Sequence, residues 1–154
     1  MSTPEQRLKK LGLKLPAVPS PVANYVPYKF AGNFLYMSGQ GPRRPEGTYS
    51  VGKLGQNISI QQGYLDAQLA GLQLLAVAKS ALGELSRIEA VIKLLGMVNA
   101  EPDYSAHPEV INGCSDLFVE IFGEAGRHAR SAVGMGSLPN QMTVEIEAIF
   151  LVKT

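Results

Sequence analysis

Two strand-like runs near the C-terminus carry the clearest hydrophobic pattern in the chain. The first is residues 130–133 (Arg-Ser-Ala-Val), and the second is residues 143–152 (Thr-Val-Glu-Ile-Glu-Ala-Ile-Phe-Leu-Val). Between them lies a turn that contains Gly134, Gly136 and Pro139. Glycine and proline between two such runs predict a hairpin or a strand-loop-strand.

The second run has two different faces, because alternate residues of a strand point to opposite sides. One face is wholly apolar and consists of Val144, Ile146, Ala148, Phe150 and Val152. The other consists of Thr143, Glu145, Glu147, Ile149 and Leu151. This second face mixes carboxylates with large aliphatic residues, so it is neither simply solvent-exposed nor simply core.

Helical patterns come earlier in the chain. Ser59-Ile60-Gln61-Gln62 has the spacing of a capping box and predicts a helix over residues 59–82, ended by Gly83. A proline in the first turn predicts a second helix over residues 108–122, ended by Gly123. The expected buried face of the second helix is Val110, Ile111, Cys114, Leu117, Phe118, Ile121 and Phe122.

Strands are also predicted at residues 34–37 and 90–98, with a short one at residues 49–54. The order of strands, helix, strand, helix and strands predicts an α+β sandwich with both helices on one face of the sheet. Two helices cover only that face, and the other carries Ile149 and Leu151. Exposed apolar area of this kind marks an interface, so we expect a homo-oligomer packed through its sheets.

The N-terminal residues are expected to lie outside this core. Thr3-Pro4-Glu5 predicts the start of a short helix within residues 1–15, and we interpret this basic segment as a solvated arm rather than as a partner-binding arm. Residues 16–27 contain four prolines and are expected to be extended and irregular.

Composition narrows the functional classes. The 154 residues are 45% hydrophobic and 18% charged, with a net charge of +1, which disfavours a dedicated nucleic-acid binder. One cysteine excludes an internal disulfide, and with two histidines it disfavours a structural zinc site. No apolar run approaches the roughly 20 residues of a membrane span, and no secretory signal is evident, so we expect a soluble cytoplasmic protein.

Several stretches resemble one known family, in order and at its spacing, from about residue 25 to residue 152. They are Gly32-Asn33 to Ser38-Gly39-Gln40 with Pro42, Asn112 in the second predicted helix, Arg130-Ser131-Ala132-Val133, Leu138-Pro139, and Val144-Glu145-Ile146-Glu147-Ala148. These residues are similar to the YjgF/RidA family of imine/enamine deaminases, formerly labelled endoribonuclease L-PSP. The resemblance implies a chorismate-mutase-like (ferredoxin-like) fold over residues 25–154, after an N-terminal extension of residues 1–24. It also implies a homotrimer with sites between its subunits.

The resemblance assigns roles to individual positions. It implies that Arg130 holds the substrate carboxylate and that Glu145 lies near the attacking water. The further positions that line or support the cleft are Tyr25, Ser38, Asn112 and Ala132. Ala132 stands where many members have a reactive cysteine, and His128-Ala129 replaces a more usual aromatic-proline pair. These departures, an extra residue between Asn112 and Arg130 and the N-terminal extension indicate a divergent subgroup.

The chemistry suits these residue types. Hydrolysis of a 2-imino acid needs an anchor for the carboxylate, a positioned water and a protonated nitrogen, and it requires no metal or organic cofactor. A guanidinium binds a carboxylate with two parallel hydrogen bonds. Arg130 could instead be a surface ion-pair donor, and Glu145 could be an interface carboxylate. Tyr25 could close the cleft or belong to a core or interface, whereas we interpret Glu147 as structural.

The remaining reactive residues give weaker signals. Cys114 falls on the predicted buried helix face, where a thiol is an inert small hydrophobe. His107 and His128 lie in predicted loops, and neither permits a Ser-His-Asp arrangement to be argued.

Three functions follow for this chain. The first is cofactor-free deamination of 2-imino or 2-enamino acids. The second is non-catalytic or regulatory binding of small carboxylates in the same clefts. The third is an endoribonuclease that uses the basic cluster Arg127-His128-Ala129-Arg130, although we consider nucleic acid an improbable partner.

Overall fold

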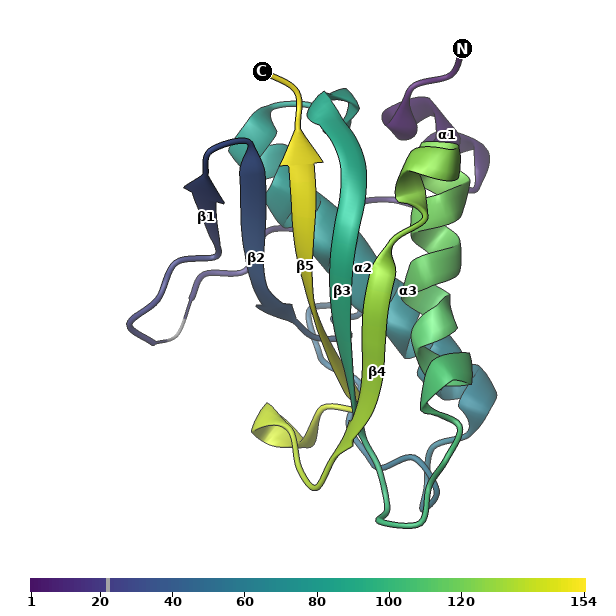
Figure 1. The fold of residues 1–154 in the computed structure, drawn as a ribbon. Coiled ribbons are helices and arrows are strands. Elements are labelled where there is room, and N and C mark those ends of the chain that lie inside the picture. Colours follow the sequence, from purple (N-terminus) through teal and green to yellow (C-terminus); the bar gives the residue numbers. More distant parts are fainter. Residues whose placement is uncertain (22) are drawn as a thin grey trace.

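In a computed structural model, which describes residues 1–21 and 23–154, one five-stranded sheet is backed on one face by two long helices (Figure 1). The strands are β1 (Tyr28–Ala31), β2 (Phe34–Gln40), β3 (Ile88–Asn99), β4 (Ala129–Met135) and β5 (Val144–Val152). The helices are α1 (Pro4–Lys10), α2 (Ile60–Leu82) and α3 (His107–Phe122), with short 3-10 turns η1 (Leu85–Arg87), η2 (Gly123–Gly126) and η3 (Pro139–Gln141). The predicted α+β sandwich is confirmed.

The sheet order is β1-β2-β5-β3-β4. Strands β3 and β4 run parallel, and the other neighbouring pairs are antiparallel. Because β3 lies between β4 and β5, the two C-terminal runs form a strand-loop-strand and not a hairpin. Strand β4 is therefore an edge strand, and α3 packs beside it.

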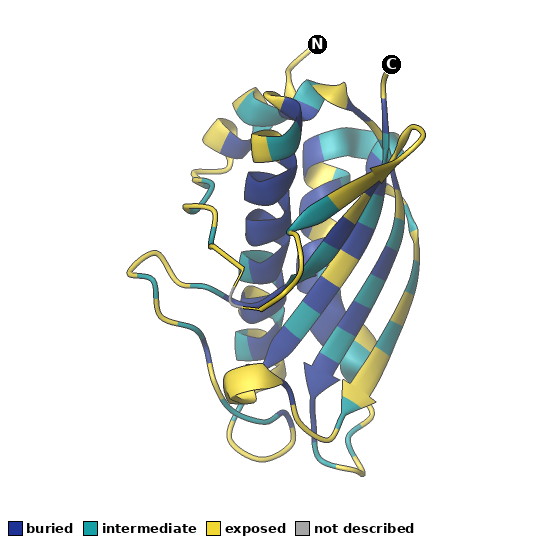
Figure 2. Cartoon of the chain, turned by 90° about the vertical axis from the view of Figure 1, so that its left-hand side faces the viewer, coloured by how far each residue is buried: buried dark blue, intermediate teal, exposed yellow. Residues whose placement is uncertain are grey.

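The two predicted faces of β5 are confirmed. Val144, Ile146 and Phe150 are fully buried under the helices, and Figure 2 shows how buried and exposed residues alternate along the strands. Thr143 is the exception, because it was expected to share the face of Glu145. It lies just before the strand, is fully buried, and donates a hydrogen bond of 2.7 Å to Asp66 Oδ2 of α2.

Both long helices begin and end where the sequence predicts. The Ser59 hydroxyl accepts a hydrogen bond from the Gln62 backbone N–H, and Gly83 ends α2 with a φ of 89°. Gly123 ends α3 with a φ of 64°. Gly113 sets how closely the helices pack, because a Cβ there would overlap the Tyr64 carbonyl oxygen of α2.

The chain between β2 and α2 was predicted less well. Residues 49–54 do not form a strand. They make only isolated bridges, which join Tyr49 to Arg43, Val51 to Met142, and Leu54 to Ile58 and Ala100. The Ser50 hydroxyl instead donates 2.8 Å to the buried Asp66, and Gly52 turns the backbone with a φ of 136°. Strand β1 was not predicted. The irregular conformation expected for residues 16–27 is confirmed for all of them except residue 22, which lies outside the described residues, and β1 begins directly after this segment.

The interpretation of the N-terminus as a solvated arm is wrong. Leu8 of α1 is only 4% exposed and belongs to the hydrophobic core. Glu5 Oε1 accepts a hydrogen bond of 2.7 Å from the Leu85 backbone N–H. Arg7 Nη1 donates a hydrogen bond of 3.1 Å to the Ile121 carbonyl at the end of α3. Further along, the Ala17 carbonyl accepts from the buried Gln73 amide of α2. The extension is thus a docked part of the fold.

A substitution at Leu8 tests this docking. Removing a buried leucine side chain costs about 2–5 kcal/mol, so Leu8→Ala should lower Tm by roughly 4–20 °C in a thermal unfolding experiment. Leu11→Ala is the matched control, because Leu11 is 44% exposed. Equal, small effects of the two substitutions would show that α1 is not packed on the core.

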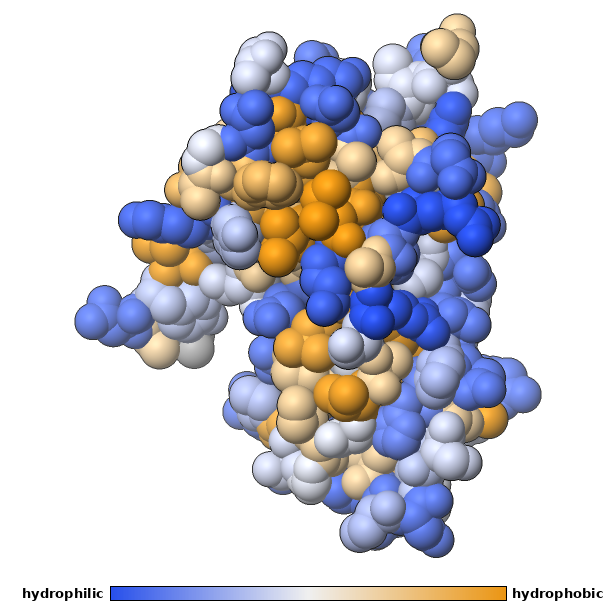
Figure 3. Space-filling view, in the orientation of Figure 1, coloured by the Kyte–Doolittle hydropathy of each residue, from blue (hydrophilic) through white to orange (hydrophobic). Residues whose placement is uncertain are grey.

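The face of the sheet opposite the helices carries apolar side chains, as expected. Phe34, Tyr36 and Val133 are 40%, 45% and 38% exposed. In Figure 3 apolar surface lies over the middle of this open face in two areas that a hydrophilic band separates. A shallow groove of about 230 Å³ runs along it, lined by Tyr36, Met37, Lys93, Leu95, Glu147, Ala148 and Ile149. Within the described part of the chain, no helix has the length and apolarity needed to cross a membrane.

Candidate functional site

Arg130 is held against α3 by three hydrogen bonds. It pairs in register with Leu94, which is buried under the helices, so its side chain lies on the helix side of the sheet. Its Nη1 donates hydrogen bonds to Asn112 Oδ1 (2.9 Å) and Ser115 Oγ (3.0 Å), and its Nη2 donates one to the Pro108 carbonyl (3.2 Å). These bonds fix the guanidinium in one orientation, and the supporting role implied for Asn112 has a direct geometric basis.

The guanidinium still has donors to offer. It carries five N–H groups, of which three make the bonds above. Among the described residues, no acceptor is bonded to the N–H on Nε or to the second N–H on Nη2. Arg130 borders an open pocket of about 250 Å³, whose other lining residues are Asn112, Ser115, Asp116, Val119, Arg127 and His128. The arrangement can bind a small anion.

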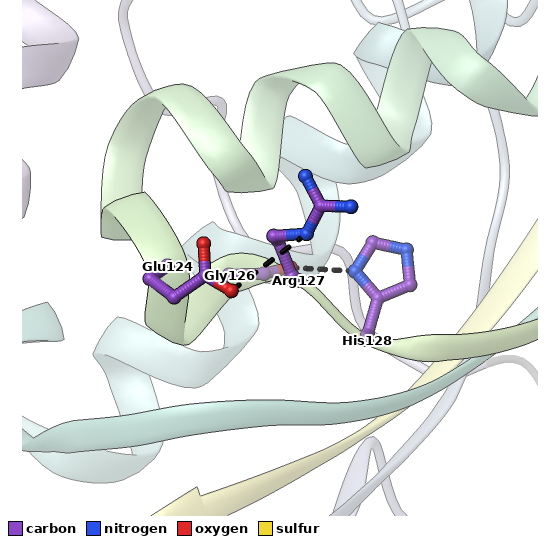
Figure 4. A network of polar contacts seen from close by, with 4 residues as sticks. All are labelled: Glu124, Gly126, Arg127 and His128. Carbon is purple, nitrogen blue, oxygen red and sulfur yellow. Dashed lines mark hydrogen bonds and ion pairs between the residues drawn. The ribbon is translucent and has the colours of Figure 1, made fainter.

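His128 lies beside this arginine with both ring nitrogens engaged. Nδ1 is 2.6 Å from the Gly126 carbonyl, and Nε2 is 2.8 Å from Ser115 Oγ. Figure 4 shows the first of these contacts as a dashed line. A carbonyl only accepts, so Nδ1 carries the proton, and Nε2 accepts from the Ser115 hydroxyl. The Ser115 oxygen is then free to accept from Arg130. Burial lowers the pKa of His128 below its ordinary value, and the Arg130 charge lowers it further, while the bond to Gly126 opposes both.

This lowered pKa makes stability depend on pH. Because the pKa of His128 is lower in the folded chain, the unfolded chain binds a proton there first as the pH falls below the ordinary pKa of histidine. The stability contributed by neutral His128 is therefore lost as pH falls. We expect the unfolding free energy of the wild type to fall more between pH 7 and pH 5 than that of His128→Gln. Urea unfolding at both values measures the difference. Parallel pH dependences would show that His128 is not held neutral.

Other charged and reactive groups around the pocket are engaged or buried. Asp116 accepts 2.7 Å from the Tyr64 hydroxyl, a bond that raises the pKa of Tyr64 to about 12. Arg127 makes an exposed contact of 3.8 Å with Glu124 (Figure 4), a kind of pair that contributes little. Cys114 is fully buried, which raises its thiol pKa and confirms it as an unreactive core residue. Among residues 1–21 and 23–154, no group of three or more His, Cys, Asp or Glu side chains could hold a metal ion.

Glu145 forms a second cluster on the open face of the sheet. Its carboxylate lies over Gly39 so closely that a Cβ at position 39 would overlap it. Gly39 lies in a register irregularity of the β2–β5 pairing, between Met37 and Gln40. Burial, and then the charge of Glu147, raise the pKa of Glu145 above its ordinary value. The carboxylate is thus poised to hold a proton more tightly than an exposed glutamate.

Ser38 fixes the chain that leads into this second cluster. Its hydroxyl donates 2.6 Å to the Val26 carbonyl, and its backbone N–H donates 3.0 Å to the Pro27 carbonyl. Tyr25 lies one residue before this anchored segment and is 50% exposed. Ser38 therefore places the predicted cleft tyrosine at the β2 side of the sheet.

The two clusters lie on opposite faces of the sheet within one chain. Arg130 aligns with Leu94 and Ala148, which face the helices, whereas Glu145 aligns with Met97 on the open face. Ala132, two residues after Arg130, faces the helices and packs against the core. The structure therefore brings Arg130, Asn112 and Ala132 to one side, and Glu145 and Ser38 to the other, while Tyr25 lies exposed in the segment that Ser38 anchors.

Sequence reasoning missed Ser115, and it considered His128 only within the basic cluster of an endoribonuclease. Both carry a periodic signal that could have linked them to Asn112 and Arg130. Ser115 lies three residues after Asn112 and so shares its face of α3. His128 lies two residues before Arg130, the spacing that places side chains on one side of extended chain.

The sheet order, the two helices on one face and the basic pocket beside the edge strand define an α+β protein of the chorismate-mutase-like class. The chain belongs to the family described as "YjgF/chorismate_mutase-like, putative endoribonuclease", whose model matches residues 5–148. Solved structures that carry the names RidA and YjgF share the fold at lower identity. The resemblance stated from the sequence is confirmed.

Three relatives resemble the chain along most of its length. Protein TCP17 of Trypanosoma cruzi is 41% identical over 143 residues, which cover 92% of this chain and 89% of that protein. The solved structure of Atu1372 from Agrobacterium tumefaciens, described as a protein with unknown function, is 44% identical with a TM-score of 0.91, covering 97% and 92% of the two chains. That of a "putative endoribonuclease" from Shewanella oneidensis MR-1 is 38% identical with a TM-score of 0.95, covering 98% and 100%.

Proposed function

We propose that the protein hydrolyses 2-imino acids and their 2-enamino tautomers to 2-keto acids and ammonia, without a metal or organic cofactor. The observation that carries this proposal is the Arg130 guanidinium, which three bonds hold in place while two of its N–H groups stay available in an open pocket. A carboxylate bound there places the adjacent C=N carbon at the pocket, where water can attack it.

The site is completed by a second copy of the chain. Arg130 lies at the β4 edge of the sheet, while Glu145 lies on the open face. A ring of copies, each with its β4 edge beside the open face of the next, puts both groups in one cleft. The family resemblance implies three copies. This packing also covers the apolar side chains of the open face, such as Phe34 and Tyr36.

Glu145 then orients the attacking water. Its carboxylate accepts a hydrogen bond from water, and its position over Gly39 fixes the direction from which water approaches. Ser38 and Tyr25 shape the same side of the cleft. Positioning of this kind lowers the barrier because the water no longer has to find its orientation during the reaction.

An imine-trapping assay tests the activity. An amino-acid oxidase generates 2-imino acids from a panel of amino acids, and semicarbazide traps the imine that survives. We expect added protein to reduce the trapped product and to release ammonia faster. Unchanged trapping across the panel would refute the activity for those substrates, and a monomer in native mass measurement would refute the shared cleft.

Non-catalytic binding of small carboxylates is a second candidate, favoured by Ala132, which supplies no ionisable group to the Arg130 side. Pyruvate or 2-oxobutyrate would then raise Tm, while imine trapping stays unchanged.

An endoribonuclease is a third candidate, because the family description and the Shewanella relative both carry that word. RNA cleavage that survives purification and disappears in Arg130→Ala would favour it. Cleavage that persists in that variant would point to a contaminant.

A further inference from the structure

The proposed reaction needs a group that moves protons beside Arg130. Water must lose a proton as it attacks, and the departing nitrogen must gain one. The Arg130 guanidinium stays charged in proteins and cannot accept a proton. Ala132 has no proton-bearing side chain. In this pocket the Ser115 hydroxyl and the His128 ring can both give and take a proton, whereas the Asp116 carboxylate is already bonded to the Tyr64 hydroxyl.

We propose that Ser115 and His128 form a proton relay in the Arg130 pocket. Ser115 Oγ takes a proton from the attacking water while its own proton passes to His128 Nε2, and the pair later returns the proton to the departing nitrogen. The relay rests on the proposed imine hydrolysis. Ser115 touches the substrate, whereas His128 acts through Ser115.

The geometry of the pair suits this role. Ser115 Oγ is 2.8 Å from His128 Nε2 and 3.0 Å from Arg130 Nη1. It is therefore next to the group that holds the substrate carboxylate. The Gly126 carbonyl fixes the Nδ1–H tautomer from the other side of the ring. The Phe118 ring packs edge-on against His128, with the two ring centroids 6.2 Å apart.

The surrounding charges keep His128 available as a proton acceptor. Arg130 from β4 and Arg127 from the preceding loop border the same pocket, and the Arg130 charge disfavours a charged ring. Asp116 of α3 is bonded to the Tyr64 hydroxyl, and Glu124 of η2 contacts Arg127. Among the described residues, no carboxylate is bonded to the His128 ring. The ring is therefore neutral at pH 7.

The protons and electron pairs balance over the whole reaction. Water oxygen bonds to the imine carbon and gives one proton to the relay, and the C=N electron pair becomes a lone pair on nitrogen that receives this proton. The resulting carbinolamine then gives its hydroxyl proton to the relay as the C=O bond forms. The nitrogen takes that proton, the C–N bond breaks, and ammonia leaves. Serine and histidine end in their starting states.

Three variants in the imine-trapping assay test the relay. His128→Gln keeps an acceptor for the Ser115 hydroxyl but cannot take its proton. We expect its kcat to fall about 10²-fold or more, with KM changed less than about threefold. His128→Ala should fall similarly and recover when imidazole is added, in proportion to free imidazole base. Ser115→Ala should also lose activity, but imidazole should not restore it. His107→Gln is the matched control and should keep full activity, because the His107 ring packs edge-on against Tyr104 instead.

The outcomes separate the relay from the function on which it rests. A wild-type protein that hydrolyses no imine overturns the proposed function and the relay together. An active wild type with His128→Gln at wild-type kcat overturns the relay alone. Failure of imidazole to restore a folded His128→Ala, as judged by its Tm, also counts against the relay, because a merely structural loss would give that result.

Discussion

Replacing Arg130 by alanine is expected to lower kcat/KM for 2-imino acid hydrolysis by about 10²–10⁴-fold. The variant loses two charge-assisted hydrogen bonds to the substrate carboxylate, each of which contributes about 1.5–3 kcal/mol. Most of the loss should appear as a higher KM, because the carboxylate is held in the ground state and in the transition state alike. Steady-state kinetics in the trapping assay measure kcat and KM separately.

Two further variants test whether the effect is specific to the Arg130 guanidinium. Arg127→Ala removes an exposed arginine from the rim of the same pocket and should change kcat/KM less than about threefold. Arg130→Lys keeps the charge but cannot make three bonds to α3 and a two-pronged bond to substrate, so it should resemble the alanine variant. Full activity in Arg130→Lys would contradict a fixed guanidinium anchor.

Replacing Glu145 by glutamine is expected to lower kcat about 10²-fold and to leave KM nearly unchanged. The amide fits the same space over Gly39, but it cannot polarise water as a carboxylate does. The change also removes the repulsion from Glu147, so folding should be unimpaired. Thermal unfolding separates a catalytic loss from a structural one.

Glu147→Gln is the matched control for this variant. Glu147 lies two residues along the same strand face, is exposed, and borders the open-face groove. Its substitution should preserve kcat within about threefold. A larger loss of kcat in Glu147→Gln than in Glu145→Gln would show that Glu147, and not Glu145, positions the water.

The fold could be predicted where local patterns are decisive. The Ser59 and Gly83 signals placed both ends of α2, and strict alternation in β5 assigned its buried face correctly. Local patterns failed where distant contacts decide the conformation. Thr143 and Ser50 turn toward Asp66, a helix residue far away in sequence, and this contact overrides the strand pattern of both segments. The docking of Leu8 likewise depends on the ends of distant helices.

The individual residues of the candidate site could be predicted from the sequence, but their arrangement in space could not. Alternation placed Glu145 opposite the core, yet it could not place Arg130, because the sequence did not show that β3 separates β4 from β5. The resulting separation of the two residues onto opposite faces is a property of the sheet order. Ser115 was missed, and its pairing with His128 could not be predicted, because their contact depends on how α3 packs beside β4.

The most direct test of a shared site mixes two inactive variants. Arg130→Ala supplies Glu145 but no anchor, and Glu145→Gln supplies the anchor but no carboxylate. If each cleft takes Arg130 from one copy and Glu145 from the next, trimers assembled randomly from equal amounts should have about a quarter of their clefts intact. The account predicts that co-expressed, mixed trimers regain roughly this fraction of wild-type activity. Activity no higher than the mean of the two parent variants would contradict it.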